Sequence, residues 1–123
     1  MTSRIAVLAI DATDIRLVAD FWAAVLGWRV IDEDTDIISI GPADASWPTI
    51  DVCAVPEAKT VKNRLHLDLR ADGSSTEEEI ARVVALGGRH VDVGQPPDAT
   101  WTVLADPEGN EFCILKRTVQ EVR

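Results

Sequence analysis

Histidine and aspartate alternate with leucine at one point of the chain, in the order Leu65, His66, Leu67 and Asp68. In a strand, side chains alternate between the two faces, so His66 and Asp68 would share one face and the leucines the other. An imidazole beside a carboxylate has two roles open to it. It forms a structural hydrogen bond with Asp68 or with the backbone, or it contacts a ligand or a metal ion.

The two cysteines, Cys53 and Cys113, lie sixty residues apart. If the halves of the chain are copies of each other, both thiols share the face of His66, and such a set suits zinc. The spacing lacks the short Cys-x-x-Cys pair of dedicated zinc sites, and a buried cysteine behaves as a small hydrophobic residue in most cores. The sequence therefore favours a site without metal. In the alternative, a metal ion is held by His66, Cys53, Cys113 and Glu111.

The first half of the chain has the pattern of a strand, a helix and three further strands. Apolar residues at helical spacing run from Ile15 to Leu26, with Thr13 or Asp14 as the cap and Gly27 as the end. Strands are predicted at residues 5–11, 28–32, 37–41 and 49–55.

The second half repeats this order. It has a predicted strand at 65–70, a helix at 75–86 that buries Ile80, Val83 and Val84, and strands at 90–93, 101–105 and 111–115. Ser75 and Glu78 fit a capping box at the start of the helix. Four residues recur at an offset of sixty, namely Leu26, Gly27, Arg29 and Asp32 as Leu86, Gly87, Arg89 and Asp92. Two copies of a βαβββ unit are the simplest explanation.

The composition and charge of the chain exclude some classes of binding partner. The 123 residues carry a formal charge of −9, which repels phosphate backbones and anionic lipid headgroups. No apolar stretch approaches the length of a membrane span, and no signal-peptide core is present, so we expect a cytoplasmic protein with free thiols. Nucleic acid and membrane partners are not expected.

Three segments resemble one known superfamily: FWAAVLGW at 21–28, KTVKNRLHLDLRADG at 59–73 and DPEGNEFCIL at 106–115. They look like the glyoxalase/bleomycin resistance/dioxygenase proteins, also called vicinal oxygen chelate proteins, and in particular the glyoxalase-like domain subgroup. The resemblance implies an α+β fold in which two tandem βαβββ modules form a curved mixed sheet around a cleft. Residues 1–123 would then be one domain, with modules at about 4–56 and 63–116.

Enzymes of this superfamily hold a divalent metal with ligands from the first and last strand of each module. By this resemblance the four positions fall at Val7, Cys53, His66 and Cys113. Val7 is found by counting back from the helix and Gly27, and Ala6 takes its place if the register slips by one. His66 alone is a usual ligand. Asp51 and Glu111 precede the cysteines by two residues on the same strand faces and so approach the rim. The pattern therefore departs from that of the enzymes, and we expect no cofactor, although a divalent metal stays possible.

Two tryptophans near strand ends, Trp47 and Trp101, offer flat apolar walls for a ligand, or else plug the cavity or pack at a dimer contact. The resemblance implies a homodimer that binds a small organic molecule, as the bleomycin-resistance members sequester theirs. One alternative is a lyase, isomerase or dioxygenase that uses a divalent metal; another is a regulatory or partner-binding module with a filled cleft. No role is derived for Lys62, Asn63 and Arg64. The predicted ligand contacts are His66, Val7, Cys53, Cys113, Trp101, Trp47 and Asp68.

Overall fold

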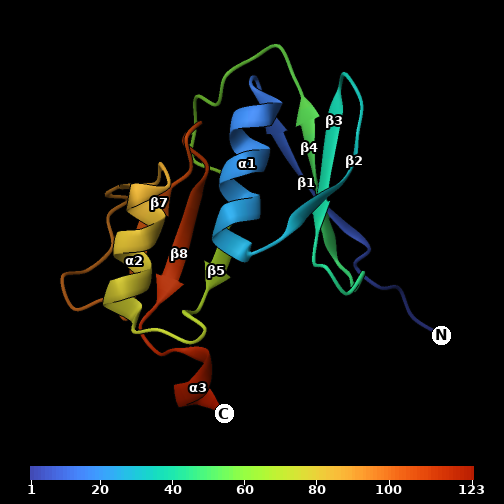
Figure 1. Ribbon diagram of the computed structural model, residues 1–123. Coiled ribbons are helices and arrows are strands. Elements are labelled where there is room, and N and C mark those ends of the chain that lie inside the picture. The colour runs from blue at the N-terminus through green and yellow to red at the C-terminus, as the bar shows by residue number, and fades with distance from the viewer. The chain divides into compact units, whose positions relative to one another are not determined.

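The structure is a computed structural model that describes residues 1–123. It consists of two compact units, residues 1–58 and 59–123. Each unit contains a four-stranded mixed sheet and a helix between its first two strands (Figure 1). The strand orders are β1-β4-β3-β2 and β5-β8-β7-β6, so the second unit repeats the topology of the first. The predicted pair of βαβββ units and the α+β class are confirmed.

Unit one contains β1 (Val7–Ala12), α1 (Ile15–Leu26), β2 (Arg29–Glu33), β3 (Ile37–Gly41) and β4 (Thr49–Ala54). The outer strand β1 runs parallel to β4, and the other neighbours are antiparallel. β1 begins two residues later than predicted, at Val7, because its pairing with β4 starts opposite Thr49.

Both ends of α1 were predicted from local chemistry. The Asp14 carboxylate accepts a hydrogen bond from the Leu17 N–H at 3.1 Å, and Gly27 ends the helix in the left-handed conformation with φ of 67°. The helix contacts β3 and β4. Its buried side chains are Val18, Ala19, Phe21, Trp22 and Val25.

Unit two contains β5 (Leu67–Leu69), α2 (Thr76–Ala85), β6 (Arg89–His90), β7 (Trp101–Ala105), β8 (Glu111–Leu115) and a short α3 (Val119–Val122). β5 and β6 are shorter than predicted. The β5 ladder with β8 covers only three residues, which leaves His66 just outside the strand. β6 ends at His90, ahead of a loop that contains Pro96 and Pro97, which lack the N–H needed for strand pairing.

The capping box at α2 is present in full. The Ser75 hydroxyl accepts from the Glu78 N–H, and the Glu78 carboxylate accepts from the Ser75 N–H, each at 3.1 Å. The predicted buried face is wrong in part: Val83 is buried, Ile80 is half-buried and Val84 is exposed. The reason is that α2 touches its sheet mainly along β8, which covers a narrow strip of the helix. No helix in the structure has the length and apolar character needed to cross a membrane.

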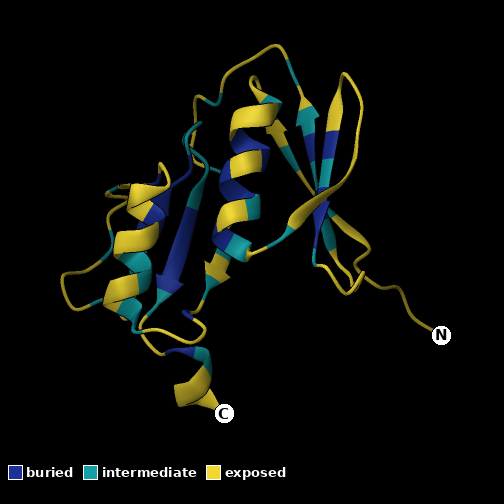
Figure 2. Cartoon of the chain, viewed as in Figure 1, coloured by how far each residue is buried: buried dark blue, intermediate teal, exposed yellow.

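Each sheet buries one face more deeply than the other. In unit one, Ile38, Ile40, Ile50 and Val52 are buried on one face, whereas Ser39, Asp51 and Cys53 alternate with them and stay half-buried (Figure 2). In unit two, alternation places Leu104, Phe112 and Ile114 on one face and Val103 and Cys113 on the other. The polar candidates of both units therefore lie opposite the main buried layer.

Candidate functional site

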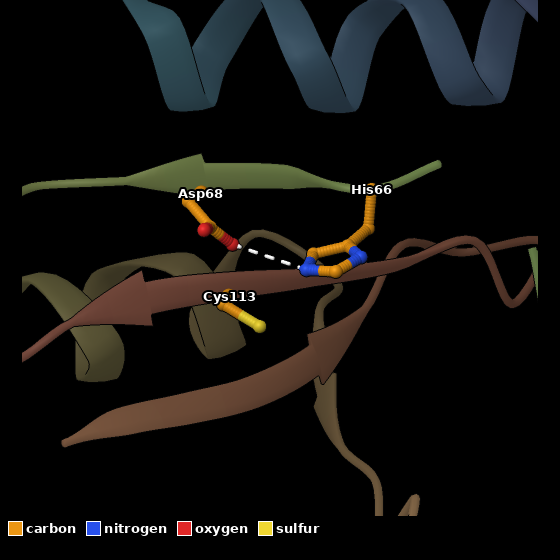
Figure 3. A group of neighbouring side chains, drawn as sticks. All are labelled: His66, Asp68 and Cys113. Carbon is orange, nitrogen blue, oxygen red and sulfur yellow. Dashed lines mark ion pairs between the residues drawn. The ribbon is translucent and has the colours of Figure 1, made fainter. Parts of the chain in front are cut away.

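Three ligand-capable side chains of unit two meet across the ladder of β5 and β8. Asp68 on β5 pairs in register with Cys113 on β8, and His66 lies two residues before Asp68 on the same face. The His66 Nε2 is 3.3 Å from the Asp68 Oδ1 (Figure 3). One ligand atom from each of the three residues lies within 4.8 Å of the others. We call His66, Asp68 and Cys113 the His66 cluster.

The members of the His66 cluster differ in exposure and in acidity. His66 and Asp68 are exposed, whereas Cys113 is buried. Burial, the charge of Asp68 and the hydrogen bond to Asp68 together raise the pKa of the Cys113 thiol to about 11, against a smaller opposing effect of Lys62. The thiol is therefore protonated at neutral pH, whereas a metal ligand or nucleophile must be a thiolate.

The equivalent place in unit one has no imidazole. Cys53 on β4 pairs with Asp11 on β1, just as Cys113 pairs with Asp68. Two residues before Asp11 is Ala9, so Ala9 is the counterpart of His66. The count back from the helix predicts this counterpart at Val7, or at Ala6 with a slipped register, and the strand pairing shows that both positions are wrong. The count started from the helix, but two residues join β1 to α1 whereas six join β5 to α2.

The Asp51 carboxylate of unit one is engaged by a neighbouring strand. The Ser39 hydroxyl donates to the Asp51 carboxylate at 2.7 Å. Burial raises the pKa of the Cys53 thiol, and the charges of Asp51 and Asp11 add to this. Val7 lies on the same face of β1 as Asp11 and hence on the face of Cys53. Unit one thus brings together Val7, Cys53 and two carboxylates.

Glu111 lies outside the His66 cluster because its carboxylate is bound elsewhere. The Lys59 ammonium donates to its Oε2 at 2.7 Å, and the Asn63 backbone N–H donates to its Oε1 at 3.1 Å. Burial alone would raise the pKa of Glu111, but these two hydrogen bonds and the Lys59 charge outweigh it and hold the pKa below its usual value. Asp68, and not Glu111, is the carboxylate beside His66 and Cys113.

Asn63 also fastens the segment before β5 to the turn before β8. Its side-chain amide donates to the Asn110 side chain at 2.8 Å, and the Asn110 amide donates to buried Asp106 at 2.9 Å. Asp106 further accepts the Glu108 and Asn110 N–H groups, so the turn is held by its own residues, as predicted. The sequence assigned no role to Asn63, because its partner is 47 residues away.

The two tryptophans of the predicted site lie in different units. Trp47 is half exposed and stacks against Arg4, whose guanidinium carbon is 3.9 Å from the ring centroid. Trp101 opens β7 and is also partly exposed. Because Val103 pairs with Cys113, Trp101 lies on the same sheet face as the His66 cluster. Unit two thus collects His66, Asp68, Cys113 and Trp101 on one face.

Solved structures of the same fold come from several bacteria. The fosfomycin resistance protein FosX from Mesorhizobium loti is 15% identical, with a TM-score of 0.71 over 99% of this chain and 98% of that one. A FosX variant from Listeria monocytogenes, complexed with Mn(II) and 1S,2S-dihydroxypropylphosphonic acid, is 14% identical, with a TM-score of 0.72 over 99% and 98%. A glyoxalase/bleomycin resistance protein/dioxygenase family enzyme from Burkholderia phytofirmans is 19% identical, with a TM-score of 0.68 over 91% and 97%.

At these identities the structural likeness establishes the fold and no particular reaction. No similar protein was found among curated proteins. The family profile described as glyoxalase-like domain matches residues 7–115, which is most of the chain. The protein therefore belongs to the glyoxalase-like domain family, within the glyoxalase/bleomycin resistance/dioxygenase (vicinal oxygen chelate) superfamily.

Proposed function

We propose that this protein binds a small organic molecule on the face of unit two that carries the His66 cluster and Trp101, and that it does so without a full catalytic metal site. The observation that carries the proposal is an exposed His66–Asp68 pair beside a buried, protonated thiol. The imidazole and carboxylate offer hydrogen bonds to a ligand, and the Trp101 indole offers a flat apolar surface. This combination suits sequestration of a ligand, as in bleomycin resistance.

The contacts predicted in unit one, Val7, Cys53 and Trp47, remain predicted ligand residues of that unit alone. The proposal keeps the single domain of residues 1–123 and the cytoplasm as its location. The chain has a formal charge of −9, and this favours neutral or cationic molecules over nucleic acid.

A divalent metal fits this donor set only in part. The cluster supplies one nitrogen, one oxygen and one sulfur, a mixture that suits zinc better than the hard cations that prefer oxygen. Asp68 already pairs with His66, and metal binding would have to remove the proton from Cys113. If an ion were held, His66, Asp68 and Cys113 would hold it, and it would act as a Lewis acid.

Elemental analysis of the purified protein tests the metal part of the proposal. We expect far less than one equivalent of Zn, Mn, Fe or Ni per chain, and we expect His66→Ala to change this content little. Cys113→Ala and Cys53→Ala form a matched pair, because both thiols lie opposite an aspartate but only Cys113 has a histidine nearby. One tightly held metal per chain, lost in His66→Ala and Cys113→Ala but kept in Cys53→Ala, would contradict the proposal.

The second candidate function is a metal-dependent lyase, isomerase or dioxygenase. It is favoured by one observation, the 4.8 Å span of the ligand atoms in the His66 cluster. The metal result just described, together with an activity that the metal restores, would make this candidate the better one.

The ligand-binding part is tested by screening a small-molecule fragment library against the protein by NMR. We expect hits to shift resonances of the His66 cluster and Trp101, and His66→Ala to weaken them. Hits that bind His66→Ala as tightly as the parent would sink the proposed site.

We also propose a homodimer, since an unpaired outer strand of a sheet is commonly covered by a second subunit. β1 and β2 are the outer strands of unit one, and every residue of β2 is exposed. Light scattering coupled to sizing should give twice the chain mass of 13.4 kDa at micromolar concentration. A monomer mass would overturn the proposal.

A further inference from the structure

A hollow opens at the outer edge of β7, where β6 stops early. The last bond between these strands runs from the Val91 N–H to the Val103 carbonyl at 3.2 Å. The chain then turns away, because the Asp92 carboxylate accepts the Gly94 N–H at 2.8 Å and Gly94 takes a φ of 88°. Pro96 and Pro97, which follow, lack the backbone N–H that pairing with β7 would need. The loop and the strand thus diverge around an open space.

This hollow measures about 610 Å³, within the range of sites for small molecules. Trp101 and two prolines supply flat apolar surface, and Asp92 is the only acidic or basic side chain of the lining apart from His90. The lining consists of His90, Val91, Asp92, Gln95, Pro96, Pro97, Ala99, Trp101, Thr102 and Val103.

Several polar groups in this lining have no partner in the protein. The His90 imidazole, the Trp101 indole N–H and the second carboxylate oxygen of Asp92 make no hydrogen bond, whereas Gln95 is engaged with the Val93 N–H and the Val91 carbonyl. Hydrogen-bonding directions alternate along a strand, so the backbone N–H and C=O of Trp101 point the same way as those of Val103, toward the hollow. A ligand therefore finds acceptors and donors already in place.

The charge of the lining selects the kind of ligand. Asp92 brings one negative charge, and no lysine or arginine lines the hollow. The chain as a whole carries −9, which adds to the attraction for cations. An indole face also attracts a cation, so the wall and the carboxylate favour the same charge.

We propose that this hollow at the β6–β7 edge is a second ligand site, which shares the Trp101 wall with the proposed site but includes no residue of the His66 cluster, and that it takes a planar organic cation. The flat body lies against Trp101 and the prolines. The cationic N–H groups donate to the free oxygen of Asp92. This site depends on the β6–β7 edge and not on the proposed function of the His66 cluster.

Three probes with the same flat ring test the charge: benzamidine, benzamide and benzoate, which are cationic, neutral and anionic. Each is titrated into ¹⁵N-labelled protein and followed by NMR. We expect the shifts to centre on the Trp101 indole and the amides of residues 91–103, with benzamidine binding about five-fold more tightly than benzamide, as a partly exposed ion pair allows. Benzoate should bind most weakly. Equal affinities for the three probes, or shifts centred elsewhere, would overturn the proposal.

Two variants on the same loop locate the charge. Asp92→Asn keeps a side-chain oxygen for the Gly94 N–H, so the turn survives while the charge is lost. It should abolish the preference for benzamidine over benzamide, whereas the matched change Asp98→Asn, at an exposed acid outside the lining, should leave it intact. Trp101→Ala should weaken both probes. An unchanged preference for benzamidine in Asp92→Asn would refute the cation site. His66→Ala distinguishes this site from the proposed function, because it should leave benzamidine binding intact. Loss of benzamidine binding in His66→Ala would overturn the proposal of a second site.

Discussion

The two units share one topology but differ on the face that carries polar residues. In unit one, Ala9, Asp11, Asp51 and Cys53 occupy this face, and their counterparts in unit two are His66, Asp68, Glu111 and Cys113. On the opposite face both units keep buried apolar residues, such as Val52 and its counterpart Phe112. The fold thus requires the apolar pattern in both copies, whereas the polar face is free to differ.

The two units also differ in what their carboxylates on this face bind. Asp51 accepts one side-chain hydrogen bond, from Ser39, which lies on the adjacent strand. Glu111 binds Lys59 and Asn63, which precede β5, and so secures the segment that leads into His66. This support holds the chain before β5 in place, because the ladder itself holds only three residues of β5 and leaves His66 just outside it.

The largest effect is expected from the apolar face. Phe112 is fully buried, and Phe112→Ala should lower the free energy of unfolding by about 4 kcal/mol, through lost burial and the cavity left behind. Val52→Ala removes less volume from an equally buried place in unit one and should cost less. Urea unfolding of both variants measures this. An equal loss in the two would indicate that unit two repacks around the cavity.

Alkaline pH should destabilise the protein through Cys113. The pKa of this thiol is raised from 9.0 to about 11, so between these values the unfolded chain releases a proton that the folded chain keeps. Stability should therefore fall as the pH rises from 9 to 11, by roughly 3 kcal/mol from this group at about 1.4 kcal/mol per unit.

Unfolding of the parent and of Cys113→Ala across this pH range isolates the contribution. The variant should lose the part of the fall that Cys113 carries, whereas Cys53, whose thiol pKa is also raised from 9.0, contributes equally in both proteins. A variant with the same alkaline slope as the parent would show that the thiol does not carry the effect.

The smallest expected change in stability comes from removing the carboxylates of Glu111 and Asp51. Glu111→Ala should cost about 2 kcal/mol, because it removes two hydrogen bonds to a charged group and leaves half-buried Lys59 without its partner. Asp51→Ala removes one such bond and should cost about 1 kcal/mol. Thermal unfolding of both variants gives the comparison. A larger loss in Asp51→Ala would reverse the assignment of Glu111 as the stronger support.

Local chemistry in the sequence determined the elements of this protein. Helical spacing, the caps at Asp14 and Ser75, and Gly27 predicted both main helices, and the offset of sixty residues predicted the repeated topology. These signals act over a few residues or repeat as whole units, so they are readable without tertiary contacts. The family resemblance rested on the same continuous segments, and residues 7–115 bear it out.

Only the tertiary structure decided which side chains meet. The register of β1 against β4 made Ala9, and not Val7, the counterpart of His66, because the loops that precede the helices differ in length. The ladder of β5 and β8 placed Asp68 beside Cys113, while Lys59 and Asn63 bound Glu111 from about fifty residues away. Such contacts depend on strand register and on burial, and neither is encoded by the spacing of any single segment.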